Sequence, residues 1–249
     1  MLEGIPNAAV VTDVSLRAAI IATNRPWRVR DNASNIEMLL VPNGTFTMGA
    51  SADDTEASTD EIPQHQVSLT EGFYLGKTEV TQAVWLAEMG SNPSYFSGYS
   101  DSPSRPVERV SWDMAQTFCT QNSLRLPTEA EWEWACRAGT VTPRYGVLDD
   151  IAWHTTNSGG ATHSVATKLP NALGFYDTLG NVWEWNQDWY GQYSSAGAIN
   201  PTGPATGAYR VFRGGSWVNL INFCRASRRA ADTPSTVYVE LGLRVARNP

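Results

Sequence analysis

The spacing of apolar and polar positions predicts three short helices between residues 81 and 139. Thr81 stands directly before Gln82–Met89, and Gly90 follows that segment. Ser111 stands before Trp112–Asn122 in the same way. Ser and Thr side chains accept hydrogen bonds from the unpaired N–H groups of a first helical turn, and Gly favours a helix end. We therefore expect a helix in each segment.

The third helix has the fullest set of signals. Thr128 opens the segment TEAEWEWACRAG, Glu131 follows at the position that a capping box requires, and Gly139 closes it. Three of its apolar residues recur at the spacing i, i+3 and i+4, so they share one helix face that we expect to be buried. These residues are Trp132, Ala135 and Cys136.

Strand signals lie on both sides of these helices. Met38–Met48 has an apolar run, a turn at Pro42–Gly44 and an alternating run, which predicts a β-hairpin. Gln66–Leu69 and Phe73–Lys77 are expected to form another pair of short strands. Asn171–Tyr190 is rich in aromatic residues and lacks helix signals, so we expect turns and short strands there.

The pattern is weak in residues 1–35, where Val10–Val11 and Ala18–Ile21 indicate a single strand or helix. We expect a poorly defined N-terminal leader in this part and one domain over residues 36–249. No internal repeat or low-complexity linker divides that domain.

Composition narrows the class of protein. Ten Trp, 20 Gly and 14 Pro among 249 residues, with 17% charged residues, predict a loop-rich domain held together by large aromatic side chains. The net charge of −7 argues against a nucleic-acid partner. No apolar run approaches the ~20 residues of a membrane span, and no signal peptide is visible. One local acidic group is expected to be a solvated loop: Asp53, Asp54, Glu56, Asp60 and Glu61.

The C-terminal segment, residues 213–249, combines fixed motifs with residues that follow no period. The motifs are Arg213–Trp217, Cys224–Arg225, Pro234 and Leu241–Arg244, and we call them the frame. The residues between them repeat neither at period 2 nor near 3.6, as a strand or helix would. The segment is therefore an irregular loop in a core-poor region, or the identity of its residues is determined by a requirement other than folding.

Seven motifs in order, over about residues 36–247, resemble the formylglycine-generating-enzyme domain family. The motifs are VPNGTFTMG, LGKTEVTQAVW, RPVERVSW, LRLPTEAEWEWACR, NALGFYDTLGNVWEW, FRGGSW and LGLR. The resemblance implies an α+β fold, namely the formylglycine-generating-enzyme-type variant of the C-type lectin fold. That fold has few helices, short antiparallel sheets and much irregular structure.

The family's enzymes oxidise a cysteine of a sulfatase peptide, using copper held by two cysteines five residues apart. Soft thiolates select Cu(I). Here Cys224 matches the second ligand, whereas Asn219 occupies the first position. Because an amide is a poor Cu(I) ligand, the resemblance implies a protein that is not an enzyme. The alternative is a formylglycine-generating-type copper oxidase or another enzyme like the sulfatase-modifying factors.

The remaining cysteines and the histidines also lack the partners and spacing found in the family's enzymes. Cys119 and Cys136 match cysteines that form disulfides in some members, but the resemblance places Val245 and Arg229 at the partner positions. We therefore expect three free thiols. A related enzyme group binds iron through three histidines. The histidines of this chain lack the i, i+3 or i, i+4 spacing of a helical metal pair; they are His65, His154 and His163.

Another branch that the chain resembles keeps the fold without catalysis: the variable proteins of diversity-generating retroelements. They end in RGGSW, CR, P and LGFR-like motifs separated by residues that a retroelement diversifies. The resemblance implies that residues 213–249 form a variable ligand-binding region, with the intervening side chains exposed on one face. We call the candidates the variable set: Val218, Asn219, Leu220, Asn222, Phe223, Arg228, Ala230, Ala231, Asp232, Tyr238, Val239 and Glu240.

The same resemblance implies a monomer that binds a protein or other macromolecular ligand and is displayed outside the cell, anchored by lipid in its full-length form. No cofactor is required. A third alternative is an accessory domain that has this fold without variation.

Some family enzymes hold a structural Ca²⁺ at oxygen ligands, which would correspond to Asp177, Gly180, Val182 and Glu184. Otherwise Glu184 accepts hydrogen bonds from nearby backbone or indole groups.

Overall fold

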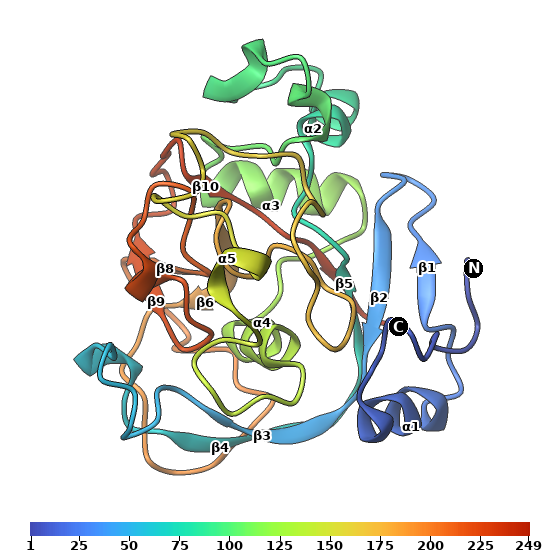
Figure 1. Ribbon diagram of the computed structural model, residues 1–249, viewed down its shortest axis with the longest axis vertical. Helices are drawn as coiled ribbons and strands as arrows, with labels where there is room; N and C mark the ends of the chain where they lie inside the picture. The colour runs from blue at the N-terminus through green and yellow to red at the C-terminus, as the bar shows by residue number, and fades with distance from the viewer.

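A computed structural model describes residues 1–249 as short elements joined by long irregular connections (Figure 1). The helices are α1 (Val14–Ala22), η1 (Thr59–Glu61), α2 (Gln82–Met89), η2 (Tyr95–Gly98), η3 (Ser102–Ser104), α3 (Trp112–Gln121), α4 (Glu129–Arg137), α5 (Leu148–Ile151) and η4 (Ile221–Phe223). The strands are β1 (Arg28–Arg30), β2 (Glu37–Val41), β3 (Gly44–Met48), β4 (His65–Leu69), β5 (Phe73–Gly76), β6 (Trp183–Trp189), β7 (Ala198–Ile199), β8 (Arg210–Arg213), β9 (Arg229–Asp232), β10 (Leu241–Gly242) and β11 (Ala246–Arg247).

These strands form three small sheets. Their orders are β1-β2-β5-β11, β10-β6-β8-β9 and β3-β4-β7. Most pairs are antiparallel, and β10–β6 and β4–β7 are parallel. The predicted α+β class with few helices and short sheets is therefore confirmed. Since β8, β9, β10 and β11 all come from the C-terminal 40 residues, this tail is built into two of the sheets.

The three predicted helices are present with the expected caps. Thr81 and Ser111 accept hydrogen bonds from the backbone N–H groups of the first turns of α2 and α3. Gly90 ends α2 in the left-handed conformation, with φ 74°. Thr128 and Glu131 form the predicted capping box of α4. Almost the whole of α4 is buried, which extends the predicted face of Trp132, Ala135 and Cys136 around the helix.

The predicted hairpin over Met38–Met48 is wrong, although both of its strands exist. β2 pairs with β1 and β5, whereas β3 pairs with β4 in another sheet. The chain changes sheets around Trp134 of α4, whose indole N–H donates to the Pro42 carbonyl at 2.9 Å. A side chain at Gly44 would come within 2.7 Å of that indole ring. The turn residues therefore form a corner over an aromatic ring.

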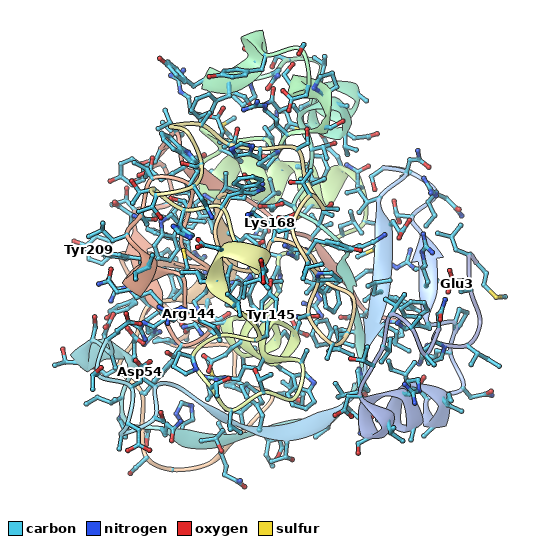
Figure 2. The ribbon with its side chains drawn as sticks, in the orientation of Figure 1. Glu3, Asp54, Arg144, Tyr145, Lys168 and Tyr209 are labelled. Carbon is cyan, nitrogen blue, oxygen red and sulfur yellow. The ribbon has the colours of Figure 1, made fainter.

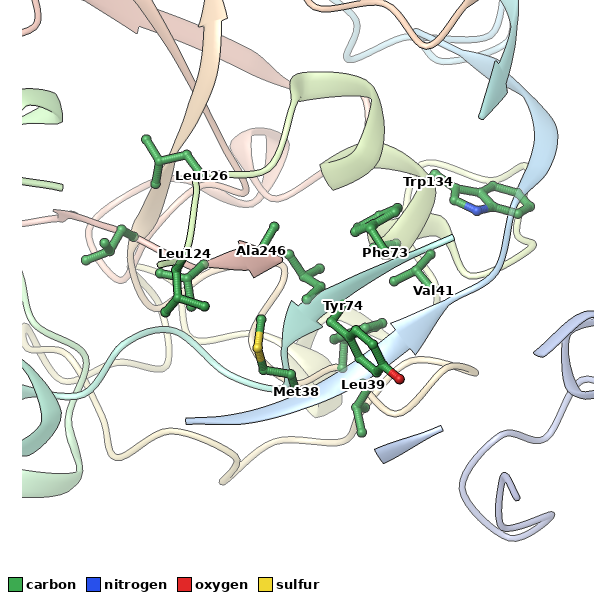
Figure 3. Packing of buried hydrophobic residues seen from close by; sticks show 14 of the residues in the cluster. Met38, Leu39, Val41, Phe73, Tyr74, Leu124, Leu126, Trp134 and Ala246 are labelled. Carbon is green, nitrogen blue, oxygen red and sulfur yellow. The ribbon is translucent and has the colours of Figure 1, made fainter. Parts of the chain in front are cut away.

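One core of 38 buried residues joins the helices and sheets. Figure 3 shows part of it, with Val41 and Phe73 near Trp134 of α4. Val11, Ile20 and Trp27 belong to the same core, so the expected boundary at residue 35 does not coincide with a division of the fold. None of the helices combines the length and apolarity needed to span a bilayer.

Candidate ligand-binding face

Most of the frame is buried, including three of its arginines. Arg213, Arg225 and Arg244 are 0%, 1% and 0% exposed. A buried guanidinium is strongly destabilising unless carboxylates and carbonyls satisfy it. Each of these arginines meets a carboxylate from outside the C-terminal segment, and the partners determine how that segment is held.

Helix α4 supplies the partners of Arg213. Its guanidinium contacts Glu133 and lies 3.1 Å from Glu129, and both carboxylates are buried. Arg229 of β9 binds Glu129 at 2.7 Å. Burial alone would raise the pKa of Glu133, but the charges of Arg137 and Arg213 outweigh burial and lower it. Strands β8 and β9 are therefore attached to α4 by a shared cluster of ion pairs.

The acidic segment 53–61 is only partly the solvated loop that its composition predicts, because Asp53 is exposed and two other carboxylates are buried. Arg225 lies 2.8 Å from Asp54 and 2.6 Å from Glu61, and Asp54 and Glu61 side chains are 3% and 0% exposed. Burial would raise the pKa of Glu61, but hydrogen bonds and charge from Arg225 lower it below its ordinary value. The reason for the error is the distant partner: Arg225 follows Glu61 by 164 residues. This loop thus supports the centre of the C-terminal segment.

Arg244 forms an ion pair with Glu184 of the GNVWEW segment, which is one of the two carboxylates among the calcium candidates. Its guanidinium binds Glu184 at 2.6 Å, and the Trp132 indole N–H donates to Glu184 at 2.6 Å. The expected indole hydrogen bond is therefore present. The side chains of Asp177 and Val182 are buried, as is Gly180.

No group of three His, Cys, Asp or Glu side chains that could hold a metal is found in the chain. One Asp177 oxygen accepts the backbone N–H of Ala166 at 2.6 Å. Calcium at these four residues stays a prediction, and it would require the Arg244 guanidinium to leave Glu184.

Residues of the variable set differ from the frame in burial. Val218, Leu220 and Tyr238 are 42%, 61% and 43% exposed. The other nine members are partly exposed, and none is buried. Two exposed neighbours, Ile221 and Val237, were missed by the sequence interpretation. Their positions between frame motifs are the signal that could have identified them.

Side-chain contacts join the three parts of the variable set. The Trp217 indole N–H donates to the carbonyl of Val239 at 3.3 Å. The Tyr238 hydroxyl donates to Asp232 at 2.7 Å. The Arg228 guanidinium lies 4.8 Å from the centre of the Phe223 ring. These contacts place the three parts next to one another, and we call their surface the binding face. It lies near β8 and β9 in Figure 1.

The main pockets of the molecule lie away from the binding face. None of the five principal pockets of the molecule is lined by a member of the variable set. Arg144, labelled in Figure 2, braces one border of the face by donating to the carbonyls of Ile221 and Cys224 at 2.8 and 3.0 Å. The face is therefore supported from beneath by Arg144, and the main pockets of the molecule lie elsewhere.

The position of the family's copper ligands has one thiol and one amide. Cys224 is fully buried, and burial raises the pKa of its thiol to about 12. The Asn219 side-chain oxygen accepts a hydrogen bond from Ser216 at 2.7 Å. All three cysteines are free and buried, as expected. A protonated, buried thiol is a poor nucleophile.

The three histidines do not form one site. His154 has a ring nitrogen 2.9 Å from Asp149, and His163 stacks on Trp153 with ring centres 3.7 Å apart. His65 lies beside Tyr193 in a different part of the fold. Each histidine thus has local structural partners.

Comparison with known proteins identifies the family. The model of the sulfatase-modifying factor enzyme 1-like domain matches residues 26–249. The formylglycine-generating enzyme of Streptomyces coelicolor is 36% identical, over 84% of this chain and 88% of that protein. Serine/threonine-protein kinase pkn1 of Chlamydia pneumoniae is 33% identical, over 85% of this chain, but the match spans only 38% of the kinase.

Solved structures agree. Treponema denticola variable protein 1 has a TM-score of 0.81 and 31% identity, covering 89% of this chain and 98% of that one. PvdO from Pseudomonas aeruginosa has a TM-score of 0.78 and 25% identity with the same coverage. Both resemblances noted in the sequence, to the enzyme family and to a variable protein, are confirmed. The chain therefore belongs to the sulfatase-modifying factor enzyme 1-like domain family.

Proposed function

We propose that this protein is a non-catalytic, receptor-like or adhesin-like binder, and that a retroelement diversifies its binding face. One observation carries the proposal: in the C-terminal segment, most of the frame is buried and no member of the variable set is. Substitution at an exposed position usually changes stability little. Most side chains on the binding face are therefore free to vary while the backbone beneath them stays fixed; Phe223 and Ala230, which also pack against the core, are the exceptions.

The similarity to a solved variable protein supports this proposal, because it extends over 89% of the chain. The same proposal includes display outside the cell through a lipid anchor on the full-length protein, and action as a monomer without a required cofactor. These features follow from the resemblance. Labelling of intact cells with a membrane-impermeant reagent tests the location; protection of the protein in intact cells would contradict it.

The alternative is a copper oxidase, which the formylglycine-generating relatives favour. Against it stands the amide of Asn219 at the first ligand position, because an amide is a poor Cu(I) ligand. Incubation with Cu(I), oxygen and a cysteine-containing sulfatase peptide distinguishes the two functions. We expect no formylglycine by mass spectrometry, and turnover would overturn the proposal. An Asn219→Cys variant serves as the control that restores the pair of thiols.

Diversification has its own test in the genome. We expect a second copy of the 3′ end of the gene beside a reverse-transcriptase gene, differing from the first at adenines. The codons of the variable set should coincide with those differences, and the frame codons should not. A genome without such a copy would contradict diversification while leaving ligand binding itself open to direct measurement.

A further inference from the structure

An aromatic cluster outside the C-terminal segment adjoins the binding face. Phe96 of η2 is buried, and its ring lies edge-on to Trp217 with centres 5.3 Å apart. Tyr95 and Tyr99 pack on the same Phe96 ring at 5.1 and 5.8 Å. Both tyrosines nevertheless remain 66% and 48% exposed. The connection that follows α2, at the top of Figure 1, thus presents two large side chains beside a frame tryptophan.

A second contact ties this connection to the other end of the variable set. The backbone N–H of Arg109 donates to the carbonyl of Tyr238 at 3.0 Å. Trp217 in turn donates to Val239. The segment from Tyr95 to Arg109 therefore contacts the chain at Trp217, directly before the first part of the variable set, and at Tyr238 in its last part.

The two tyrosines are held in place before any ligand arrives. The Arg105 guanidinium lies 3.9 Å from the Tyr99 ring centre and binds Asp101 at 2.7 Å. The Phe96 N–H donates to the buried Glu108 carboxylate at 2.9 Å. A fixed tyrosine gives a large contact area at a low cost in conformational entropy, which is why binding loops use it often.

We propose that Tyr95 and Tyr99 are constant anchors of the binding face, shared by all variants of the tail, and that the partners are folded protein surfaces. This inference rests on the proposed function. The division of roles is physical: the tyrosines supply contact area to each partner, and the variable set decides which partner fits.

Shape and charge both favour a protein partner. None of the five main pockets is lined by the variable set, and its most exposed apolar members are Val218, Leu220 and Tyr238. Charges of both signs surround these apolar residues, which is typical of protein interfaces. A nucleic acid or an anionic membrane would instead require a basic surface. The charged residues are Arg109, Arg228, Asp232 and Glu240.

Two display libraries test the inference without the natural ligand. Both randomise the variable set, and one also carries Tyr95→Ala and Tyr99→Ala. Each is selected against lysozyme as a folded protein and against maltoheptaose as a glycan. A third library with Leu169→Ala and Ile199→Ala is the matched control, because these side chains are also exposed, at 60% and 72%, and contact neither the cluster nor the binding face.

We expect lysozyme binders from the first and third libraries. Replacing both tyrosines by alanine in a selected binder should raise its Kd at least tenfold, with its Tm unchanged within about 2 °C. Equal affinities with and without the tyrosines would overturn the anchor role. Binders to maltoheptaose but not to lysozyme would overturn the choice of partner. If folded libraries yield no binder at all, the proposed function fails as well.

Discussion

The frame and the variable set alternate along one short segment, yet they meet opposite physical demands. Arg225 of the frame is buried against Asp54 and Glu61, which lie far away in the sequence. Leu220, only five residues earlier, is 61% exposed. Removing a member of a buried ion pair leaves an uncompensated charge, whereas changing an exposed side chain leaves the core intact. Long-range ion pairs therefore hold the frame in addition to strand pairing, which itself includes three members of the variable set in β9.

The largest effect is expected for Arg225→Met. Loss of the guanidinium would leave the buried Asp54 and Glu61 carboxylates without their cation, which destabilises the fold by about 3 to 5 kcal/mol. Arg247→Met is the control, because its ion pair with Asp31 is one-third exposed at the arginine and is worth at most about 1 kcal/mol. Urea unfolding measures both. Equal losses of unfolding free energy in the two variants would contradict the claim that the buried ion pairs of the frame stabilise the fold more than exposed ones.

The pH dependence of the unfolding free energy is expected to report on the ion pair between Arg225 and Glu61. The pKa of Glu61 is lower in the folded protein than its ordinary value of 4.5. Its contribution is therefore fully present above about pH 4.5 and is lost as the pH falls through the lower folded pKa. The difference in unfolding free energy between the native protein and Glu61→Gln should shrink as acid is added. A difference that stays constant down to pH 3 would contradict the assignment.

A smaller loss is expected for Gly215→Ala in the frame. Gly215 has φ 76°, and a side chain there would lie 3.0 Å from the Cys224 sulfur. Backbone strain and crowding together should destabilise the protein by about 1 to 3 kcal/mol. Gly159→Ala is a control with φ 63° and no atom within 4 Å, so it isolates the backbone term. Thermal unfolding should give a lower Tm for Gly215→Ala than for Gly159→Ala.

The smallest effects are expected on the binding face. Leu220→Ser and Tyr238→Ser should each change the unfolding free energy by no more than about 0.5 kcal/mol. Their circular dichroism spectra should match that of the native protein. A loss above about 1.5 kcal/mol for either variant would show that the variable set takes part in folding, and the comparison with the frame would fail.

Local signals were sufficient to predict some parts of this fold and not others. The helices at Gln82 and Glu129 were predictable because their caps and apolar faces lie within a few residues of each other. The strand partners of Met38–Val41 were not predictable. This segment pairs with β1 and β5, whereas the local turn after it resembled the turn of a hairpin. Sheet pairing is decided by contacts across the chain, which periodicity does not contain.

The candidate site shows the same limit. The frame motifs and the residues between them were visible in the sequence, and contacts in the structure join the three parts of the variable set at Phe223–Arg228 and Asp232–Tyr238. The support of Arg225 by the acidic segment was not predicted, because charged loops are usually solvated. The aromatic cluster of Tyr95, Phe96 and Tyr99 was also not predicted to adjoin the C-terminal segment, since Trp217, which packs on Phe96, lies more than a hundred positions away in the sequence.

The most direct test compares two libraries of equal size displayed on cells and challenged with protease. One randomises the twelve positions of the variable set, and the other randomises the twelve positions of the frame. We predict that most clones of the first library remain protease-resistant and that few clones of the second do. Similar resistant fractions in the two libraries would contradict the account, because the frame would then hold the fold no more than the residues between its motifs.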